Sequence, residues 1–338
     1  MPGMGAPMEV LKIGVATPPG MSAAYSYFAP AFFFGFDKAE NFELEMFYGG
    51  EPNATAQALG KGECDIASLN TVVGLVGLGR GIPMIAIGSV ARRTHRWFAV
   101  RQSSPIKMMK DLIGKRIACD FPHLRLLADA ALLEDGVPLS SVSWVPWRGS
   151  DMNCEEMSLS LASGDVDALF LIDWNDGDFV ARGMPLRHLP SKLLNRLRLS
   201  SCYWANTTAL NTKHELISRG VRVLARSLMY AMEKPERTIE IAWERFPEMR
   251  PSNVGREFAF RRHVEILKAR LAPMAIEPTD SSSDWGHMSG DEFQHLQDCL
   301  LQTGALARPV DVSTCFTTEF LKDFNDLGSA SLRAVKIG

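Results

Sequence analysis

Several features that would assign the protein to a common class are missing from its sequence. No run of about 18 apolar residues occurs, so the sequence predicts no transmembrane helix. The 36 basic and 39 acidic residues are mixed along the 338-residue chain and give a net charge of −3. Because no basic stripe is present, nothing marks a surface for nucleic acid or for anionic lipid. We therefore expect neither nucleic acid nor direct membrane insertion.

Motifs of common catalytic and metal sites are also missing. The seven histidines form no H-x-x-x-H pair, and no G-x-S-x-G nucleophile elbow is present. The six cysteines include no C-x-x-C pair, and Cys64 and Cys119 lie within or beside apolar runs, as buried structural thiols do. We expect no metal, no cofactor and no catalytic residue. A cysteine paired with a histidine distant in the sequence stays open, although no cysteine falls in an expected strand-end turn.

A glycine-rich stretch, residues 74–81, invites comparison with a nucleotide-binding loop. It follows an expected helix instead of a strand, and its spacing does not fit G-x-G-x-x-G. We interpret these glycines as a turn that ends the helix.

Two stretches, 56–70 and 159–176, follow one plan. Each begins as a helix that ends at a glycine, Gly62 or Gly164, where a left-handed cap is accessible. Each continues through acidic residues into a short apolar strand and then into polar residues. In open α/β sheets, ligands bind beyond the carboxyl ends of the strands. Two such units facing each other predict two lobes with a cleft between them.

The rest of the chain fits an α/β fold. Strand-like and helix-like segments alternate up to Pro190, as in mostly parallel sheets flanked by helices, and helical patterns follow. A chain of 338 residues, 46% of them hydrophobic, is long enough for two cores. We expect the first lobe, with the C-terminal helices, in residues 8–96 and 203–338. The second lobe is expected in residues 97–202.

Candidate ligand-binding residues are those at expected strand ends. The turn after the first strand and the helix after it offer N–H groups to an anion, and an arginine can hold a carboxylate or sulfonate through two parallel hydrogen bonds. Aromatic residues provide the walls that a small-molecule cleft needs. Ordinary roles stay open, since Thr71 could cap a helix and Arg92 could lie on the surface. The expected ligand contacts are Thr17, Pro19, Met21, Tyr25, Gly50, Asn70, Thr71, Arg92, His123, Arg125, Trp147, Arg148, Asp173 and Trp174.

Three motifs resemble the SsuA/THI5 (NMT1-like) family. They are A-x-A-L-x-x-G-E-x-D-I ending at Ile66, S-P-I-x-x-x-x-D-L-x-G-K-R-I-A at 104–118, and L-A-S-G-D-V-D-A-L at 161–169. The resemblance implies a two-lobed fold of the type II periplasmic-binding-protein class with a ligand cleft between the lobes. It further implies a solute-binding protein whose hinge closes over a small anionic solute, aromatic or aliphatic, related to sulfonates, carboxylates or thiamine precursors. An ABC permease would then be the partner.

One enzymatic branch of that group, the aromatic sulfinate desulfinases, is similar at 104–106, at 124–127 and around 319–321. In that branch the nucleophilic cysteine lies in the turn after the first strand, whereas the turn here, residues 17–20, has no thiol. The alternative function is a cytoplasmic desulfinase- or decarboxylase-like enzyme that acts on an aromatic acid.

The expected location follows from the N-terminus. The stretch before Lys12 has no apolar core, which predicts no secretory signal. We expect a cytoplasmic protein if the chain is complete as given, and a periplasmic or other extracytoplasmic one if a leader has been removed.

Overall fold

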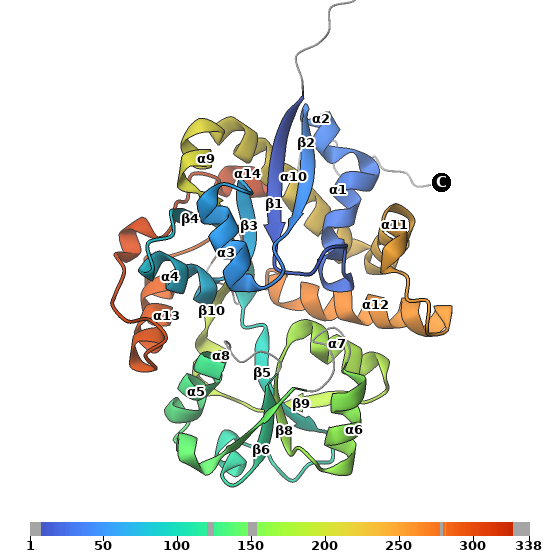
Figure 1. The fold of residues 1–338 in the computed structure, drawn as a ribbon, viewed down its shortest axis with the longest axis vertical. Coiled ribbons are helices and arrows are strands. Elements are labelled where there is room, and N and C mark those ends of the chain that lie inside the picture. Colours follow the sequence, from blue (N-terminus) through green and yellow to red (C-terminus); the bar gives the residue numbers. More distant parts are fainter. Residues whose placement is uncertain (1–7, 120–124, 148–153, 278–279, 281, 327–338) are drawn as a thin grey trace, which may run out of the picture.

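The computed structural model describes residues 8–119, 125–147, 154–277, 280 and 282–326. Two five-stranded sheets lie one above the other, each flanked by helices (Figure 1). We call the part built on the upper sheet the first lobe and the part built on the lower sheet the second lobe. The predicted two-lobed α/β class is confirmed.

The sheet of the first lobe has the strand order β2-β1-β3-β10-β4. Strands β2, β1 and β3 are parallel, and β10 runs antiparallel to both of its neighbours, β3 and β4. Strand β1 lies between β2 and β3, and its Leu11, Ile13 and Val15 are fully buried. The strands are β1 (Glu9–Val15), β2 (Phe42–Tyr48), β3 (Ile66–Asn70), β4 (Met84–Arg93) and β10 (Arg198–Asn206).

The sheet of the second lobe repeats this arrangement in the order β7-β6-β8-β5-β9. Strands β7, β6 and β8 are parallel, and β5 is antiparallel to its neighbours β8 and β9. The chain passes between the lobes at the β4–β5 connection and again between β9 and β10. The strands are β5 (Arg96–Arg101), β6 (Arg116–Cys119), β7 (Ser143–Pro146), β8 (Ala168–Ile172) and β9 (Leu186–His188).

The two matching stretches occupy equivalent places in the two sheets. Helix α3 (Pro52–Lys61) precedes β3, and helix α6 (Glu155–Ser163) precedes β8. The helices end at Gly62 and Gly164, whose φ values are 77° and 80°. Glycine suits both positions because the left-handed conformation strains residues that carry a Cβ.

The acidic residues after these glycines fix each unit to its sheet in the same way. Asp65 accepts a hydrogen bond from the N–H of Lys12 in β1 at 2.9 Å, and Asp167 accepts one from the N–H of Arg116 in β6 at 2.8 Å. The N–H of each aspartate donates back to the carbonyl of the same strand residue. The expectation that both units share one plan is therefore met by their hydrogen bonds as well as by their order.

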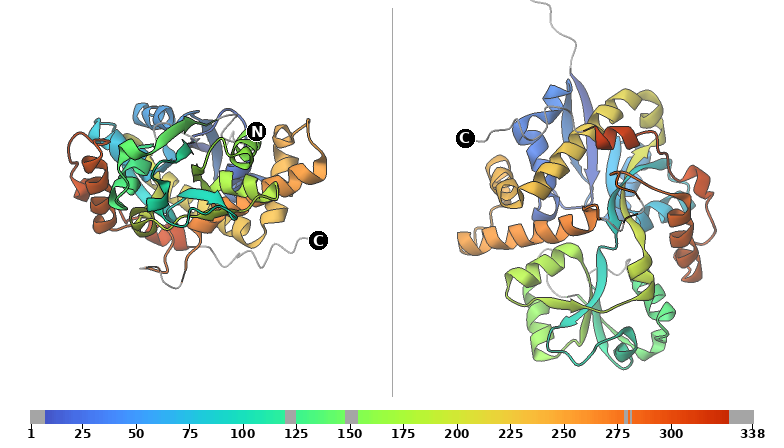
Figure 2. Two further views of the ribbon diagram at one scale, coloured as in Figure 1. Left: turned by 90° about the horizontal axis from the view of Figure 1, so that it is seen from below. Right: turned by 180° about the vertical axis from the view of Figure 1, so that it is seen from behind.

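Helices cover both sheets. In the first lobe, the long helix α10 buries one face against the core, and α12 lies along the edge that faces the second lobe (Figures 1 and 2). The helices of the first lobe are the 3₁₀ helix η1 (Ala23–Phe28), α1 (Ala29–Phe34), α2 (Phe36–Ala39), α3, α4 (Thr71–Gly79), α9 (Thr207–Thr212), α10 (His214–Glu233), α11 (Pro235–Arg245), α12 (Arg256–Leu271), α13 (Gly290–Gln302) and α14 (Leu321–Asn325). Those of the second lobe are α5 (Arg125–Glu134), α6, α7 (Asp173–Ala181) and α8 (Lys192–Arg196). Short 3₁₀ turns lie at Met109–Leu112, Leu139–Ser141, Pro247–Met249, Ala272–Met274 and Val312–Thr314.

The structure corrects the interpretation of the glycine-rich stretch. Gly74 and Gly77 lie inside α4, and only the end of the stretch forms a turn, where Gly81 has a φ of 80°. A Cβ at Gly74 would lie 2.0 Å from the ring of Trp204 in β10. The glycine therefore allows the helix to approach the sheet closely.

The expected lobe boundaries stay a prediction, although the sheets divide near them, and β10 already begins at Arg198. None of the helices in the described part of the chain has the length and the apolar character needed to cross a bilayer.

Candidate functional site

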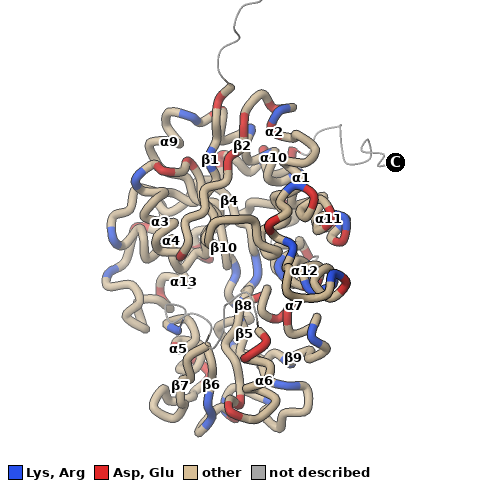
Figure 3. The backbone as a smooth tube through the Cα atoms, turned by 45° about the vertical axis from the view of Figure 1, so that its right-hand side comes forward, with Lys and Arg blue, Asp and Glu red and all other residues tan. Residues whose placement is uncertain are grey.

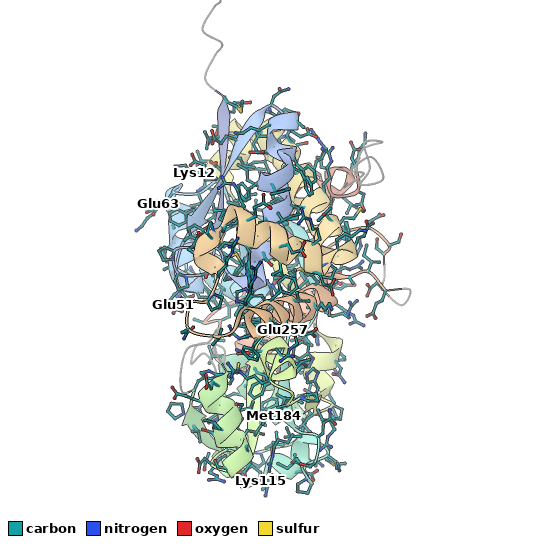
Figure 4. All side chains as sticks on the ribbon, turned by 90° about the vertical axis from the view of Figure 1, so that its right-hand side faces the viewer. Lys12, Glu51, Glu63, Lys115, Met184 and Glu257 are labelled. Carbon is teal, nitrogen blue, oxygen red and sulfur yellow. The ribbon has the colours of Figure 1, made fainter. Side chains whose placement is uncertain are left out.

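The lobes are joined by a buried ion pair between α7 and α12. Asp173 begins α7 in the second lobe, and Arg270 lies in the last turn of α12 in the first lobe. Arg270 Nη1 donates to Asp173 Oδ2 at 2.9 Å, and the two residues are 4% and 0% exposed. Figure 4 shows α12 at the junction, with Glu257 of its first turn just above the second lobe and Lys115 at the far end of that lobe.

The charge state of this pair follows from its hydrogen bonds. Burial raises the pKa of the Asp173 carboxyl, and Arg270 opposes that rise. Burial also lowers the pKa of Arg270, but Asp173 and two tyrosines outweigh this effect and raise it. Asp173 accepts a second hydrogen bond, from the Trp174 N–H at 2.8 Å, and hydrogen bonds to a carboxylate favour its charged form. We treat both residues as ionised at neutral pH.

Two aromatic rings enclose the guanidinium group of Arg270. Its central carbon lies 5.7 Å from the ring centroid of Tyr25 and 5.5 Å from that of Trp174. Tyr25 belongs to η1 of the first lobe and Trp174 to α7 of the second, and their centroids are 6.4 Å apart. Both contacts are within cation–π range. The cluster therefore contains one aromatic wall from each lobe.

Three buried hydroxyl groups belong to the same cluster on the side of the first lobe. They belong to Tyr27, Ser68 and Tyr203, which are 0%, 3% and 2% exposed. Ser68 in β3 and Tyr203 in β10 are register partners. Within the described residues, none of these hydroxyls nor Arg270 Nε forms a hydrogen bond of normal geometry. A buried polar group without a partner costs about 1–3 kcal/mol, so this arrangement suits a group that accepts hydrogen bonds.

Burial keeps the phenol hydroxyls of Tyr27 and Tyr203 in their donor form. It raises the pKa of Tyr27, against the effects of Arg270 and Ser68, and it raises the pKa of Tyr203 well above the ordinary value. Both phenols are therefore protonated at neutral pH. They can donate hydrogen bonds without adding charge to the site.

The β4–β5 connection closes the cluster on the side where the chain passes between the lobes. His95 and Arg96 are 3% and 4% exposed, and the His95 carbonyl accepts the Asp173 N–H at 3.0 Å. His95 Nδ1 contacts Ser200 Oγ of β10, which links the two crossings of the chain. Burial, with Arg96 and Arg270, lowers the pKa of His95 well below its usual range, so the ring is neutral.

A small cavity adjoins these residues. It is bordered by Asn70 and Leu296 of the first lobe, Leu127 of the second, and the two crossings at His95 and Ser200. Its volume of about 20 Å³ is enough for roughly one water molecule. Figure 3 shows basic segments along α12 and beside β10 at this level, with acidic segments on α7.

Three of the residues expected to contact ligand, Tyr25, Asp173 and Trp174, meet in this cluster. Thr17 and Gly50 lie together, since the Gly50 N–H donates to the Thr17 carbonyl at 3.0 Å. Met21 packs in the core of the first lobe, and Pro19 is exposed.

Other expected contacts have ordinary partners. The Asn70 side chain accepts the Val73 N–H at 2.8 Å and caps α4. The hydroxyl of Thr71, which is fully buried, contacts Cys202 Sγ at 3.5 Å. Trp147 is partly buried against the core of the second lobe.

The two expected arginines lie elsewhere in the described structure. Arg92 donates to the Ser282 carbonyl and lies 4.0 Å from Asp280, so the structure does not bring it to the cluster. Arg125 lies over the ring of Trp144 at 4.8 Å and pairs with Asp129 at 3.6 Å. His123 and Arg148 fall outside the described residues.

The sequence interpretation omitted several members of the cluster: Tyr27, Ser68, His95, Arg96, Tyr203 and Arg270. A signal for Arg270 was present, because it follows the buried Ile266 and Leu267 at helical spacing. A charged residue in line with an apolar stripe is almost never buried without a partner. That position could have been recognised as half of a buried pair.

The described residues offer neither a reactive thiol nor a metal centre. All six cysteines are buried thiols, as expected from the sequence, and burial raises the pKa of Cys64 and Cys202 to about 12. Burial raises the pKa of Cys299 and Cys315 to about 11. No group of three or more metal-ligating side chains occurs in the described part of the chain.

The chain is similar to proteins of known structure and to a curated relative. The alkanesulfonate-binding protein SsuA from Xanthomonas axonopodis pv. citri, bound to MOPS, has a TM-score of 0.65 and 16% identity, covering 93% of this chain and 99% of that one. A variant of the desulfurization enzyme DSZB in complex with biphenyl-2-sulfinic acid has a TM-score of 0.61 and 18% identity, covering 95% and 100%. The 4-amino-5-hydroxymethyl-2-methylpyrimidine phosphate synthase of Legionella pneumophila is 20% identical over 307 residues, 87% of each chain.

The two structural likenesses are distant in sequence and establish the fold. A family model described as NMT1/THI5 like matches residues 31–238, which is more than half of the chain. This match agrees with the resemblance carried by the three sequence motifs. The chain belongs to the NMT1/THI5 like family.

Proposed function

We propose that this protein binds a small anionic organic solute between its lobes, as the solute-binding component of an ABC importer outside the cytoplasm. The observation that carries the proposal is the buried cluster at the α7–α12 contact. Arg270 lies there between Tyr25 and Trp174, beside three buried hydroxyls that form no hydrogen bond of normal geometry within the described residues.

The chemistry of the cluster suits an anion with an apolar body. Hydrogen bonds to a charged group contribute about 1.5–3 kcal/mol each, enough to favour an anion over a neutral solute of the same shape. Rings from both lobes would pack against the apolar part of the solute. The likeness to a sulfonate-binding protein supports this choice of ligand class.

The connections between the lobes suit hinge closure. The chain crosses twice, and the His95–Ser200 contact ties the crossings together beside the cluster. Few backbone positions would then absorb the rotation of one lobe against the other, as in hinged binding proteins. A solute held by residues of both lobes would favour the closed arrangement.

Calorimetry with aromatic and aliphatic sulfonates and carboxylates tests the proposal. Wild-type protein should bind at least one of them, and Arg270→Gln should weaken binding about 10- to 150-fold, the equivalent of one charged hydrogen bond. Arg226→Gln is a matched control, because Arg226 of α10 is a partly buried arginine that pairs with Glu40 outside the cluster. Tyr27→Phe removes one hydroxyl with little change in volume and should weaken binding even if Arg270→Gln does not fold.

Two results would contradict the proposal. One is the absence of binding at millimolar concentration for every anion tested. The other is a folded Arg270→Gln variant that binds as tightly as the wild type.

An enzyme that removes sulfite or carbon dioxide from an aromatic acid is the second candidate. It is favoured by the position of Asp173 and the neutral His95 beside Arg270, since titratable groups with shifted pKa values gather at catalytic sites. The likeness to DSZB gives it further support. Incubation with an aryl sulfinate or a hydroxybenzoate separates the candidates, because a binding protein returns the compound unchanged and an enzyme consumes it.

A further inference from the structure

We infer that the ion pair between Asp178 and Arg262 is a latch that holds the two lobes closed. The inference rests on the proposed function, because it concerns how firmly the lobes close over a bound solute. It goes beyond that function by naming a positioning residue, Asp178, which sets the affinity for every solute without contacting any of them.

The latch joins the same two helices as the Asp173–Arg270 pair. Asp178 lies in α7 of the second lobe and is 1% exposed, and Arg262 lies in α12 of the first lobe. Arg262 donates from Nε to Asp178 Oδ1 at 2.8 Å and from Nη2 to Asp178 Oδ2 at 3.2 Å. Two parallel hydrogen bonds of this kind fix the orientation of a pair as well as strengthening it. Asp178 lies five residues, or about 7.5 Å along the helix axis, beyond Asp173.

Asp178 has further partners in its own lobe. Its carboxylate accepts hydrogen bonds from the Cys154 N–H at 2.7 Å and from Arg182 Nε at 3.0 Å. Burial raises the pKa of the Asp178 carboxyl, but Arg262, the Cys154 N–H and Arg182 outweigh burial and lower it, so the group is charged at neutral pH. These local partners would stay with Asp178 when the lobes separate.

The latch can therefore open without leaving a bare charge in either lobe. Breaking a buried pair is most costly when one partner stays buried and uncompensated. Here Asp178 would keep its local hydrogen bonds, and Arg262, which is already partly exposed, would gain water. Between the two ion pairs, Gly177 brings α7 against the backbone of Glu265 in α12, so the helices can part at this point without moving a side chain of α7.

A latch changes affinity through the population of the closed arrangement. A solute held by residues of both lobes binds fully only when the lobes are closed, so its apparent Kd is its intrinsic Kd divided by the closed fraction. Loss of the latch lowers that fraction and raises the apparent Kd of every solute by the same factor. A residue that contacts the solute would instead change the affinities unequally from one solute to another.

The distance between the lobes in unliganded protein tests the latch directly. Glu244 of α11 and Glu156 of α6 are exposed residues of the first and second lobes on the same side of the molecule in Figure 1. Glu244→Cys and Glu156→Cys together would carry a donor and an acceptor dye, since the six native cysteines are buried. Single-molecule energy transfer should report longer distances when Asp178→Asn or Arg262→Gln is added to this labelled protein.

Calorimetry with benzenesulfonate and with benzoate tests the effect on affinity. Asp178→Asn and Arg262→Gln should each raise the Kd of both probes at least about threefold and leave the ratio of the two Kd values as in the wild type. Arg262→Gln keeps the test available if Asp178→Asn does not fold, because Asp178 then retains its bonds to Cys154 and Arg182.

Two variants within the first lobe are the matched controls. Asp65 is 7% exposed and pairs with Lys213 at 2.8 Å, and Arg226 pairs with Glu40 at 2.8 Å. Asp65→Asn and Arg226→Gln remove the same charges as the two latch variants, from pairs that do not cross between the lobes. They should lower stability but leave the interlobe distance and both Kd values unchanged.

The outcomes separate this inference from the proposed function. Unchanged interlobe distances in folded Asp178→Asn and Arg262→Gln, or equal lengthening in the controls, would overturn the latch. Longer distances with unchanged Kd values, or a changed ratio of the two Kd values, would overturn the role of Asp178 in setting affinity for all solutes. Failure of the wild type to bind either probe would count against the proposed function alone, because the distance measurement needs no solute.

Discussion

His263 provides a quantitative prediction for the pH dependence of stability. Its side chain lies on α12 and is buried, and its Nδ1 accepts a hydrogen bond from Trp243 Nε1 at 2.9 Å. Burial and the neighbouring Arg262 lower the pKa of His263 from 6.5 to about 4, and Asp178 only partly opposes them. Protonation would also remove the acceptor that Trp243 requires. The folded protein therefore keeps this imidazole neutral.

The sign of the effect follows from proton linkage. Between pH 6.5 and pH 4 the unfolded chain binds a proton at His263 that the folded protein does not, so stability falls as the pH falls. Above pH 6.5 this contribution is fully present. A difference of about 2.5 pKa units corresponds to about 3 kcal/mol of unfolding free energy, lost by pH 4.

Urea unfolding of the wild type and of His263→Gln, at pH 7 and at pH 4, measures this contribution. Glutamine can still accept the Trp243 hydrogen bond but does not titrate in this range. Between the two pH values, the wild type should lose about 3 kcal/mol more unfolding free energy than the variant. His214→Gln, a change at an exposed histidine, is the control and should behave as the wild type. Equal losses in the wild type and in His263→Gln would refute the reasoning.

Three further predictions concern packing and thiol chemistry. A Cβ at Gly177 would lie 2.4 Å from the carbonyl oxygen of Glu265. Gly177→Ala should therefore push α7 away from α12, lower the free energy of unfolding by about 1–3 kcal/mol, and weaken ligand binding in calorimetry. Unchanged affinity would show that this contact is not needed for binding. Gly74→Ala places a Cβ against the Trp204 ring and should lower the free energy of unfolding by about 1–3 kcal/mol, measured in urea. The six buried cysteines should resist a thiol reagent at pH 8 until urea unfolds the protein, and rapid labelling of the native state would contradict their burial.

Local sequence was sufficient for elements whose pattern carries its own signal. The short apolar strand expected within 159–176 is β8, and the helical patterns expected after Pro190 include the long helix α10. Helix α7 was missed because three aspartates, an asparagine and Gly177 make its sequence a poor helix former. Its close packing against α12, which requires the glycine, is a tertiary effect that no local pattern contains.

The candidate site was predictable to the extent that strand ends define it. Asp173 and Trp174 follow β8, and Tyr25 lies in the segment after β1 and its turn, so topology alone brings them toward the junction. Arg270 enters the cluster only because α12 lies between the lobes. Arg92 was expected to contact ligand because it lies at an expected strand end, but its side chain donates to the Ser282 carbonyl.

The internal repeat separates structural residues from those that give the site its chemistry. Asp65 and Asp167 occupy equivalent positions and accept equivalent hydrogen bonds from β1 and β6, so that position serves both lobes alike. The units diverge at the first residue of the helix that follows each strand. Thr71 contacts Cys202 of its own lobe, whereas Asp173, at the equivalent position, accepts a hydrogen bond from Arg270 of the other lobe. At the start of α7, Asp173 Oδ1 accepts the Trp174 N–H, which leaves Asp173 Oδ2 for Arg270 of the other lobe. The charged interlobe contact therefore lies at a position where the two units differ, and the aspartates that they share serve each sheet separately.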